Sequence, residues 1–378
     1  MKDLEKTLLK SVDRSLRQMA KYRRLRWMLN RNVGEAPLHV LSLGKAATQM
    51  AIAAMNTLPQ DRVLSLDILT KHGFYPHDLP QDMRSHIFEA GHPVPDENTE
   101  KHSKTIIERI SSIPREHELI ILLSGGTSSL FEYPREGVSF DEVVALNKTL
   151  LRCGLDVDQI NKKRREYSRV KGGGAAELFP PAKTQVFLLS DVAGDDPATI
   201  GSGPFYLPQI KNHHLVGNNL SLKKILEKCL IKSFPDYPVR LASRYVQEDS
   251  EEFAIALGRF AQSAPKGIYL FGGECSLQVM GKGRGGRLSH LALAISPKIS
   301  GEKEILFCAH TSDGNDNLKE SGGAIVNNRS WEKMIEVGNP KAALKDFDSY
   351  EILNKIDAII PGRYTGCNVN DLYILIVK

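Results

Sequence analysis

The chain has 378 residues, of which 41% are hydrophobic and 25% are charged, with a formal net charge of +5 at pH 7. These values are ordinary for a soluble globular protein that is long enough for two domains. The positive surplus is small for this length, so we expect neither nucleic acid nor a membrane among the partners.

The amino-terminal segment and the cysteines both favour a cytoplasmic protein. The basic stretch between Arg14 and Arg31 lacks the apolar core of a signal peptide. We expect an amphipathic helix there, whose buried side carries Leu8, Leu9, Val12, Leu16 and Met19. The five cysteines form no Cys-x-x-Cys pair, and an odd number cannot form a complete set of disulfides. Reduced thiols are the simplest interpretation.

Short apolar runs alternate with helical patterns along most of the chain. Strands are expected at 38–43, 63–69, 87–90, 119–123, 186–189, 267–271, 277–280, 305–309 and 373–377. Helical patterns lie at 46–58, 97–113, 140–153 and 221–233. Strands spaced by helices predict an α/β fold with βαβ units and a mostly parallel sheet. The segment 234–238 contains two prolines and predicts a boundary between domains 1–235 and 236–378.

The first segment with chemical potential follows the strand expected at 38–43. Gly44 permits a tight turn, and small residues after it let the next helix pack closely. Lys45 then lies at a helix amino terminus, where an anion is favoured and a lysine can bridge phosphate oxygens. An exposed lysine at a helix start is the alternative interpretation.

Two glycine-rich segments follow, and both are candidates for binding an anion. Directly after the strand at 119–123, paired glycines let backbone N–H groups converge on an anion, and hydroxyls can add donors. This first segment comprises Ser124, Gly125, Gly126, Thr127 and Ser128. In the second segment, Gly172 and Gly173 follow Lys171 and can approach a ligand closely. A flexible end to the preceding helix is the alternative for the second segment.

Three carboxylates crowd into a loop directly after the strand at 186–189. They are Asp191, Asp195 and Asp196. Open α/β sheets place ligands at such loops, and hard oxygen ligands suit Mg²⁺ held together with phosphate. A shared cation would relieve the repulsion between the acids. A solvated turn is the alternative.

Two further segments complete the candidate site residues. Lys282, Arg284 and Arg287 alternate with glycines, and the arginine fork suits phosphate oxygens. Asp313 follows the strand at 305–309 and is a candidate base or metal ligand. Before the last strand, Asn368 and Asn370 are expected to orient a ligand by hydrogen bonds, whereas Asp316 and Asp371 could equally cap turns.

The order of these segments resembles the glycerate 2-kinase family, whose carboxy-terminal part is called the MOFRL domain. The resemblance runs from about residue 43 to residue 378. It rests on the ordered blocks Gly44-Lys45-Ala46-Ala47, Gly91-His92-Pro93-Val94-Pro95-Asp96, Ser124-Gly125-Gly126, Lys171-Gly172-Gly173-Gly174, Ser190-Asp191-Val192-Ala193-Gly194-Asp195-Asp196, Ser202-Gly203-Pro204, Gly281-Lys282-Gly283-Arg284-Gly285-Gly286-Arg287, Asp313-Gly314 and Asn368-Val369-Asn370-Asp371.

The resemblance implies phosphorylation of D-glycerate to 2-phosphoglycerate, dependent on ATP and Mg²⁺. It also implies a Rossmann-like amino-terminal domain with a mostly parallel sheet, a smaller α/β MOFRL-type domain, and an active site in the cleft. A homodimer is left open. On the family pattern, the positions expected to be catalytic are Lys45, Asp191, Arg287 and Asp313. Family members are sometimes labelled hydroxypyruvate reductases, but the chain lacks a nicotinamide-binding fingerprint.

Several positions depart from the family pattern. Glu166 stands where the family usually has histidine, and Leu288 and His290 stand where it has asparagine and glutamate. The segments 315–320 and 362–367 differ as well. Such changes could alter which acid is bound. A kinase for another small hydroxy or sugar acid and a non-catalytic ligand-binding relative therefore stay as alternatives.

Overall fold

The computed structural model describes residues 1–75, 85–150, 157–180, 183–208 and 211–378. Contacts divide the chain into two compact units. Unit 1 comprises Met1–Met19, Asn219–Thr365 and Asn370–Lys378, and unit 2 comprises Ala20–Asn218 and Gly366–Val369. This division differs from the predicted boundary at 235 and 236. Helix α8 (Asn219–Ser233) packs on strands of unit 1, so the predicted linker lies inside that unit.

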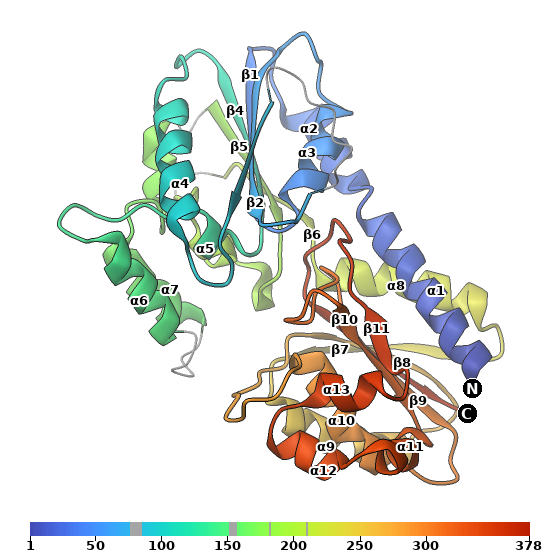
Figure 1. Cartoon of the computed structure of the whole chain (residues 1–378). Coiled ribbons are helices and arrows are strands. Elements are labelled where there is room, and N and C mark those ends of the chain that lie inside the picture. Colours follow the sequence, from blue (N-terminus) through green and yellow to red (C-terminus); the bar gives the residue numbers. More distant parts are fainter. Residues whose placement is uncertain (76–84, 151–156, 181–182, 209–210) are drawn as a thin grey trace. The chain divides into compact units, whose positions relative to one another are not determined.

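Unit 2 contains a parallel sheet with the strand order β3-β2-β1-β4-β5-β6 (Figure 1). Its strands are β1 (Leu38–Leu43), β2 (Val63–Lys71), β3 (Ser85–Ala90), β4 (Glu118–Ser124), β5 (Thr184–Leu189) and β6 (His213–Gly217). The order reverses between β1 and β4, which is the topological switch point at which such sheets bind ligands. The predicted α/β class and parallel sheet are confirmed for this unit.

Helices cover both faces of the unit 2 sheet, with α3 on one face and α4 on the other (Figure 1). The described helices are α2 (Arg23–Asn32), α3 (Ala47–Met55), α4 (Glu97–Ser111), α5 (Thr127–Leu130), α6 (Phe140–Leu150) and α7 (Val157–Tyr167). A parallel sheet buried on both faces needs apolar residues throughout, which explains the continuous apolar runs within β4 and β5. Asp96 and Thr99 form a capping box that begins α4, and Ile106 and Ile110 turn its apolar side to the core.

Unit 1 contains a mixed sheet with the strand order β11-β10-β9-β12-β8-β7. Its strands are β7 (Val239–Val246), β8 (Gly267–Gly273), β9 (Ile305–Thr311), β10 (Ser321–Asn327), β11 (Ile359–Pro361) and β12 (Asp371–Val377). Strands β7 and β8 are parallel, and the other neighbouring pairs are antiparallel. The α/β class is confirmed here as well, but the mostly parallel arrangement holds for unit 2 and not for unit 1.

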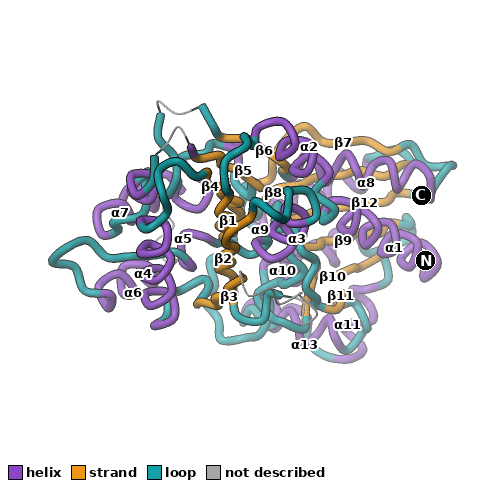
Figure 2. The backbone as a smooth tube through the Cα atoms, turned by 90° about the horizontal axis from the view of Figure 1, so that it is seen from above, coloured by secondary structure: helices purple, strands orange, loops and turns teal. Residues whose placement is uncertain are grey.

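The helices of unit 1 lie on both faces of its sheet. They are α1 (Lys2–Met19), α8, α9 (Ser250–Ser263), α10 (Arg287–Ile299), α11 (Ser330–Val337), α12 (Pro340–Lys345) and α13 (Ser349–Asn354). Helix α1 runs along α8 in both views (Figures 1 and 2). Its buried side carries the predicted apolar residues, except that Leu9 is only half-buried. None of the helices in the described residues is long and apolar enough to cross a membrane.

One predicted strand is absent from the structure, and one predicted helix extends beyond the described residues. Residues 277–280 form a loop instead of a strand, with Val279 and Met280 exposed by 59% and 83%. Apolar composition alone does not make a strand where no neighbouring strand pairs with it. The helix predicted at 140–153 is described as far as Leu150, and its last predicted residues, Cys153 included, lie outside the described residues.

The four cysteines among the described residues carry free thiols and are buried. Burial raises the pKa of Cys275, Cys308 and Cys367 to about 12. A thiol with such a pKa is not a thiolate near neutral pH and is a poor nucleophile. These cysteines are core residues of the fold.

His310 gives unit 1 a predicted dependence of stability on pH. It lies on β9, is 5% exposed, and its Nδ1 is 2.7 Å from the carbonyl oxygen of Thr311. Burial lowers its pKa from 6.5 to about 4. Between these two values the unfolded chain binds a proton that the folded chain does not. The free energy of unfolding should therefore fall by about 3 kcal/mol as the pH drops through this window, and this contribution should level off below it.

Urea unfolding of the wild type and of His310→Gln across this pH range would test the expectation. The variant lacks the titrating group, so its stability should change less between pH 6.5 and pH 4. Parallel pH profiles for the two proteins would contradict the assignment to His310.

Candidate functional site

Loops that follow four strands bring functional side chains to the carboxyl edge of the unit 2 sheet. Lys45 follows β1, His92 follows β3, Gly125 and Gly126 follow β4, and Asp191 follows β5. Open α/β sheets bind their ligands at this edge, near the point where the strand order reverses. The topology thus makes this edge the candidate functional site of unit 2.

The turns after β1 and β4 are bonded to each other. Gly44 has a φ of +112°, and a Cβ atom added there would lie 2.3 Å from Ser124 Oγ. Ser124 Oγ donates to the carbonyl oxygen of Leu43 and accepts from the N–H of Ala46, both at 3.1 Å. Ser124 was predicted to bind an anion, but in the structure it is buried and joins the two turns.

Asp191 and Asn368 lie directly on Gly125. A Cβ atom added at Gly125 would lie 1.5 Å from Asp191 Oδ2 and 2.3 Å from Asn368 Nδ2. Asn368 Nδ2 donates to Asp191 Oδ2 at 3.0 Å. Asn368 is buried and Asp191 is half-buried. Only glycine leaves room for this carboxylate, and the asparagine fixes one of its oxygens.

Lys45 and His92 lie on the next residue, Gly126. A Cβ atom added there would lie 3.0 Å from Lys45 Cγ, 3.2 Å from His92 Cδ2 and 3.3 Å from His92 Nε2. Consecutive Cα atoms are about 3.8 Å apart. The two glycines therefore bring one cation, one imidazole, one carboxylate and one amide close together. We call these four residues, Lys45, His92, Asp191 and Asn368, the glycine-floor cluster.

Sequence reasoning assigned roles to three members of this cluster and gave none to His92. The signal was present in the block Gly91-His92-Pro93-Val94-Pro95-Asp96, which contributed to the family resemblance. A histidine in a loop carries no spacing rule of its own, so only the fold places it beside Lys45.

The predicted hydroxyl donors of the β4 loop have partners within unit 2. Thr127 Oγ1 donates to the carbonyl oxygen of Ser124 at 2.8 Å. Ser128 Oγ is 2.8 Å from Ser202 Oγ, and Ser202 Oγ donates to Asn161 Oδ1 at 2.7 Å. These bonds hold the loop in place, and an anion-binding role for Thr127 and Ser128 stays a prediction.

The second glycine segment is bound internally, and the contact with a ligand that the sequence predicts for it stays a prediction. The side chain of Lys171 is 1% exposed and forms an ion pair with the equally buried Glu132. The N–H groups of Gly172 and Gly173 donate to the carbonyl oxygens of Ser202 and Gly203 at 2.9 and 2.8 Å. Their donors are thus used inside the protein, which explains the glycines as structural residues.

The three carboxylates predicted to bind Mg²⁺ have separate partners. Asp195 Oδ2 accepts from Asn218 Nδ2 at 2.6 Å, and Asp196 Oδ1 accepts from the N–H of Ala198 at 2.9 Å. Asp191 is bonded to Asn368, as described above. Within the described part of the chain, no group of three His, Cys, Asp or Glu side chains could hold a metal ion. The side chains alone therefore do not assemble the predicted site.

In unit 1, several residues predicted to be functional lie at the edge of the sheet where β8 and β9 end and β12 begins. Arg287 donates from Nε and Nη2 to the two carboxylate oxygens of Asp371, at 2.7 and 3.0 Å. Its Nη1 lies 3.1 Å from Glu274 Oε1. Burial works against the charge of Arg287, but Asp371 and Glu274 outweigh it and raise the pKa of Arg287 well above its ordinary value. This arginine was predicted to neutralise phosphate, and the fold supplies it with two carboxylates.

Asp313 and Asn370 are buried at the same edge of unit 1. Asp313 Oδ1 accepts from Thr311 Oγ1 and from the N–H of Asn315, both at 3.0 Å. Asn370 Nδ2 donates to Tyr245 Oη. These bonds fix the turns, and the predicted roles in catalysis and ligand binding stay predictions.

The glycine- and arginine-rich loop is held by carboxylates of unit 1. Arg284 is paired with Glu320 and Glu351, each at 2.6 Å, whereas Lys282 is exposed. Asp316 accepts from the N–H groups of Leu288 and Ser289 and so caps the amino terminus of α10. The loop was predicted to bind phosphate, but the structure shows a carboxylate of the chain at this helix end.

The residues that depart from the family pattern lie outside the glycine-floor cluster. Leu288 is fully buried in the core of unit 1, and His290 is 1% exposed and stacks on Phe347. Glu166 is exposed on α7, 3.6 Å from Lys163. These three positions give no structural support to an altered substrate.

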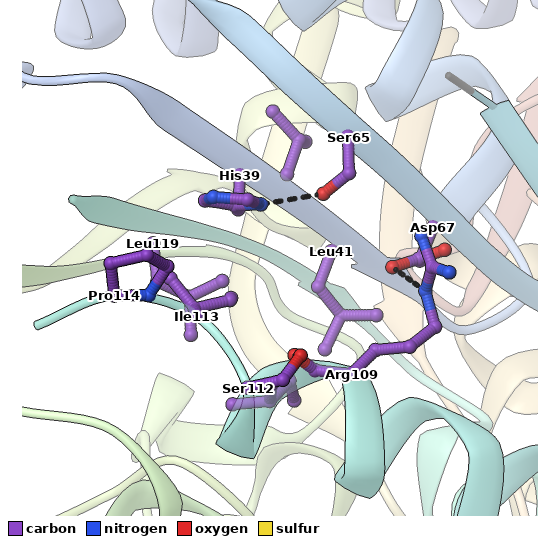
Figure 3. A pocket seen from close by; sticks show the side chains of 11 residues that line it. His39, Leu41, Ser65, Asp67, Arg109, Ser112, Ile113, Pro114 and Leu119 are labelled. Carbon is purple, nitrogen blue, oxygen red and sulfur yellow. Dashed lines mark hydrogen bonds and ion pairs between the residues drawn. The ribbon is translucent and has the colours of Figure 1, made fainter. Parts of the chain in front are cut away.

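Unit 2 also has a cavity of about 170 Å³ at the opposite edge of its sheet, at the amino ends of β1, β2 and β4 (Figure 3). His39 lies 2.8 Å from Ser65 Oγ, and Arg109 pairs with Asp67 at 2.9 Å. Burial lowers the pKa of His39 to about 4. His39 is bonded to Ser65 and Arg109 to Asp67, although Asp67 Oδ1 is buried without a hydrogen bond, and the cavity is distinct from the glycine-floor cluster.

Comparison with known proteins matches almost the whole chain. A family described as a domain of unknown function, DUF4147, covers residues 6–230, and the MOFRL family covers residues 267–371. The chain is 33% identical to a D-glycerate 2-kinase of Thermotoga maritima, with 89% of each chain covered. It is 30% identical to a putative hydroxypyruvate reductase of Agrobacterium vitis, with 89% of this chain and 98% of the relative covered.

Solved structures agree with these matches. A crystal structure of a glycerate kinase from Thermotoga maritima superposes with a TM-score of 0.84 at 28% identity and covers both chains completely. The crystal structure of a protein from Pyrococcus horikoshii superposes with a TM-score of 0.73 at 26% identity, covering 99% of this chain and 98% of that one.

Proposed function

The chain belongs to the glycerate 2-kinase family, and from this premise we propose that it transfers the γ-phosphoryl group of ATP to the 2-hydroxyl group of D-glycerate. The observation that carries the proposal for this chain is the glycine-floor cluster. It brings a lysine and a carboxylate together on Gly125 and Gly126, at the edge where parallel sheets bind ligands. A phosphoryl transfer needs both kinds of group.

In this reaction the hydroxyl oxygen of glycerate bonds to the γ-phosphorus while the bond from that phosphorus to the bridging oxygen of ADP breaks. The hydroxyl proton passes to a carboxylate, for which Asp191 is the candidate in unit 2. Asn368 holds one oxygen of Asp191 in place. Lys45 offsets negative charge on the substrates and in the transition state.

Mg²⁺ is expected to enter with ATP, because it stays bound to phosphate oxygens and several waters at such sites and needs only one or two protein carboxylates. The separate hydrogen bonds of Asp191, Asp195 and Asp196 agree with this limited contribution from the chain.

A cytoplasmic location and a homodimer also belong to the proposal, and light scattering of the purified protein would test the homodimer.

The proposal is tested by the release of ADP from Mg·ATP with D-glycerate, L-glycerate and larger sugar acids. We expect turnover with D-glycerate, and loss of that turnover when EDTA removes Mg²⁺. Turnover with another acid only would favour the changed-substrate alternative. Binding of ATP without turnover of any acid would favour a non-catalytic relative, and consumption of a reduced nicotinamide with hydroxypyruvate would contradict the kinase.

A further inference from the structure

We propose that His92 binds the substrate, and that His92 and Lys45 together form the subsite for the carboxylate of the hydroxy acid. The inference rests on the proposed function and assigns to this part of the cluster the anionic group of the substrate. It gives a role in the site to a residue whose motif predicts none.

The position of His92 is the first support. The His92 Nε2 and Cδ2 atoms and Lys45 Cγ all lie close to Gly126. Each of the three atoms is 3.0 to 3.3 Å from the position of a Cβ added there. Gly126 has a φ of +85°, which a residue with a side chain rarely adopts. Position 126 thus carries no side chain at the place that both the imidazole and the lysine approach.

The loop that carries His92 is held firmly at both ends. Gly91 directly follows β3, and a Cβ atom added to it would lie 2.5 Å from the carbonyl oxygen of Val94. Asp96 ends the loop, caps α4 and lies 2.7 Å from His72 Nε2. A loop whose ends are fixed in this way can present a side chain to a ligand with little loss of backbone entropy.

The chemistry of the neighbours indicates an anion. Lysine offers three N–H donors and imidazole offers a directional N–H donor. A carboxylate accepts from both and gains from the charge of the lysine. On the other glycine, Asp191 supplies an acceptor, which suits a hydroxyl group.

The short spacing of the two glycines favours a carboxylate over a phosphate at His92. In a 2-hydroxy acid the hydroxyl group is on the carbon next to the carboxylate, so its two subsites must be neighbours. The cation and imidazole on Gly126 and the carboxylate on Gly125 have this relation. The γ-phosphoryl group must instead lie beyond the attacking oxygen, in line with the departing ADP.

The test is a comparison of His92→Ala and His92→Gln with the control His117→Gln, which changes a half-buried histidine beside His39 at the opposite edge of the sheet. We expect His92→Ala to raise KM for D-glycerate about 10- to 100-fold, the equivalent of one hydrogen bond to a charged group. KM for ATP should stay within about twofold of the wild type, since this subsite takes only the acid. His92→Gln, which keeps an N–H donor, should recover part of the loss.

Calorimetric binding of D-glycerate and of its uncharged amide separates this inference from the proposed function. The wild type should prefer the acid over the amide, Lys45→Ala should lose most of that preference because it removes the charge, and His92→Ala should weaken binding of the acid. A higher KM for ATP, or an unchanged KM for D-glycerate, in an active and folded variant would overturn the subsite alone. A wild type that neither binds nor phosphorylates D-glycerate would overturn the proposed function together with it.

Discussion

Replacing Asp191 by asparagine is expected to lower kcat with D-glycerate about 10³-fold, within the usual range for loss of a general base. The change keeps the size of the side chain and an oxygen that can accept from Asn368. It removes only the negative charge and the capacity to take the hydroxyl proton. Steady-state ADP release and the thermal midpoint, measured on the same preparation, would report activity and folding separately.

Asp196→Asn is the matched control for this variant. Asp196 lies in the same loop but is exposed, and the oxygen that accepts the N–H of Ala198 remains in asparagine. We expect kcat to change less than about twofold, because the side chain has no place in the proposed chemistry. Equal losses in the two variants would point instead to a metal site shared by the whole loop, as the sequence predicts.

The sequence was most informative where local rules agree with the fold. The runs of β1, β4, β5 and β9 were predicted because central strands are apolar on both sides. Strands β6 and β10 were missed because His213 and His214 make β6 polar, and Ser321, Gly322 and Gly323 make the start of β10 resemble a loop. These two segments form strands because they pair with β9 and β5, and such pairing cannot be read from the segments themselves.

The sequence motifs include three of the four members of the glycine-floor cluster but do not show which of the predicted residues are bonded inside the protein. Lys45 and Lys171 look alike in the sequence, since each lies beside glycine at a turn. One lysine is half-buried beside His92, and the other is paired with Glu132. No spacing rule links Lys171 to a glutamate 39 residues away. Only the packing of the two segments shows that Lys171 is paired with a carboxylate inside the protein.

Replacing Lys171 by methionine is expected to destabilise unit 2 by about 3–5 kcal/mol, because it leaves a buried carboxylate without its cation. Both side chains are 1% exposed. Burial lowers the pKa of Lys171 although Glu132 opposes this effect. Glu132 also accepts from the N–H of Tyr133 at 2.9 Å, which does not replace a lost charge. The urea midpoint would measure the change, and Lys162→Met on the exposed side of α7 should shift it little.

The double variant Lys171→Met with Glu132→Gln separates the ion pair from a role in binding. Removing both charges leaves neither member of the pair as an unpaired buried ion, so most of the lost stability should return, although Arg164, which also interacts with Glu132, keeps its charge. If Lys171 bound phosphate, as its glycine-rich setting predicts, the single variant would stay folded and lose activity, and the second change would restore nothing. If it is structural, the double variant regains both stability and turnover, since an intact unit 2 is all that the glycine-floor cluster needs from this pair.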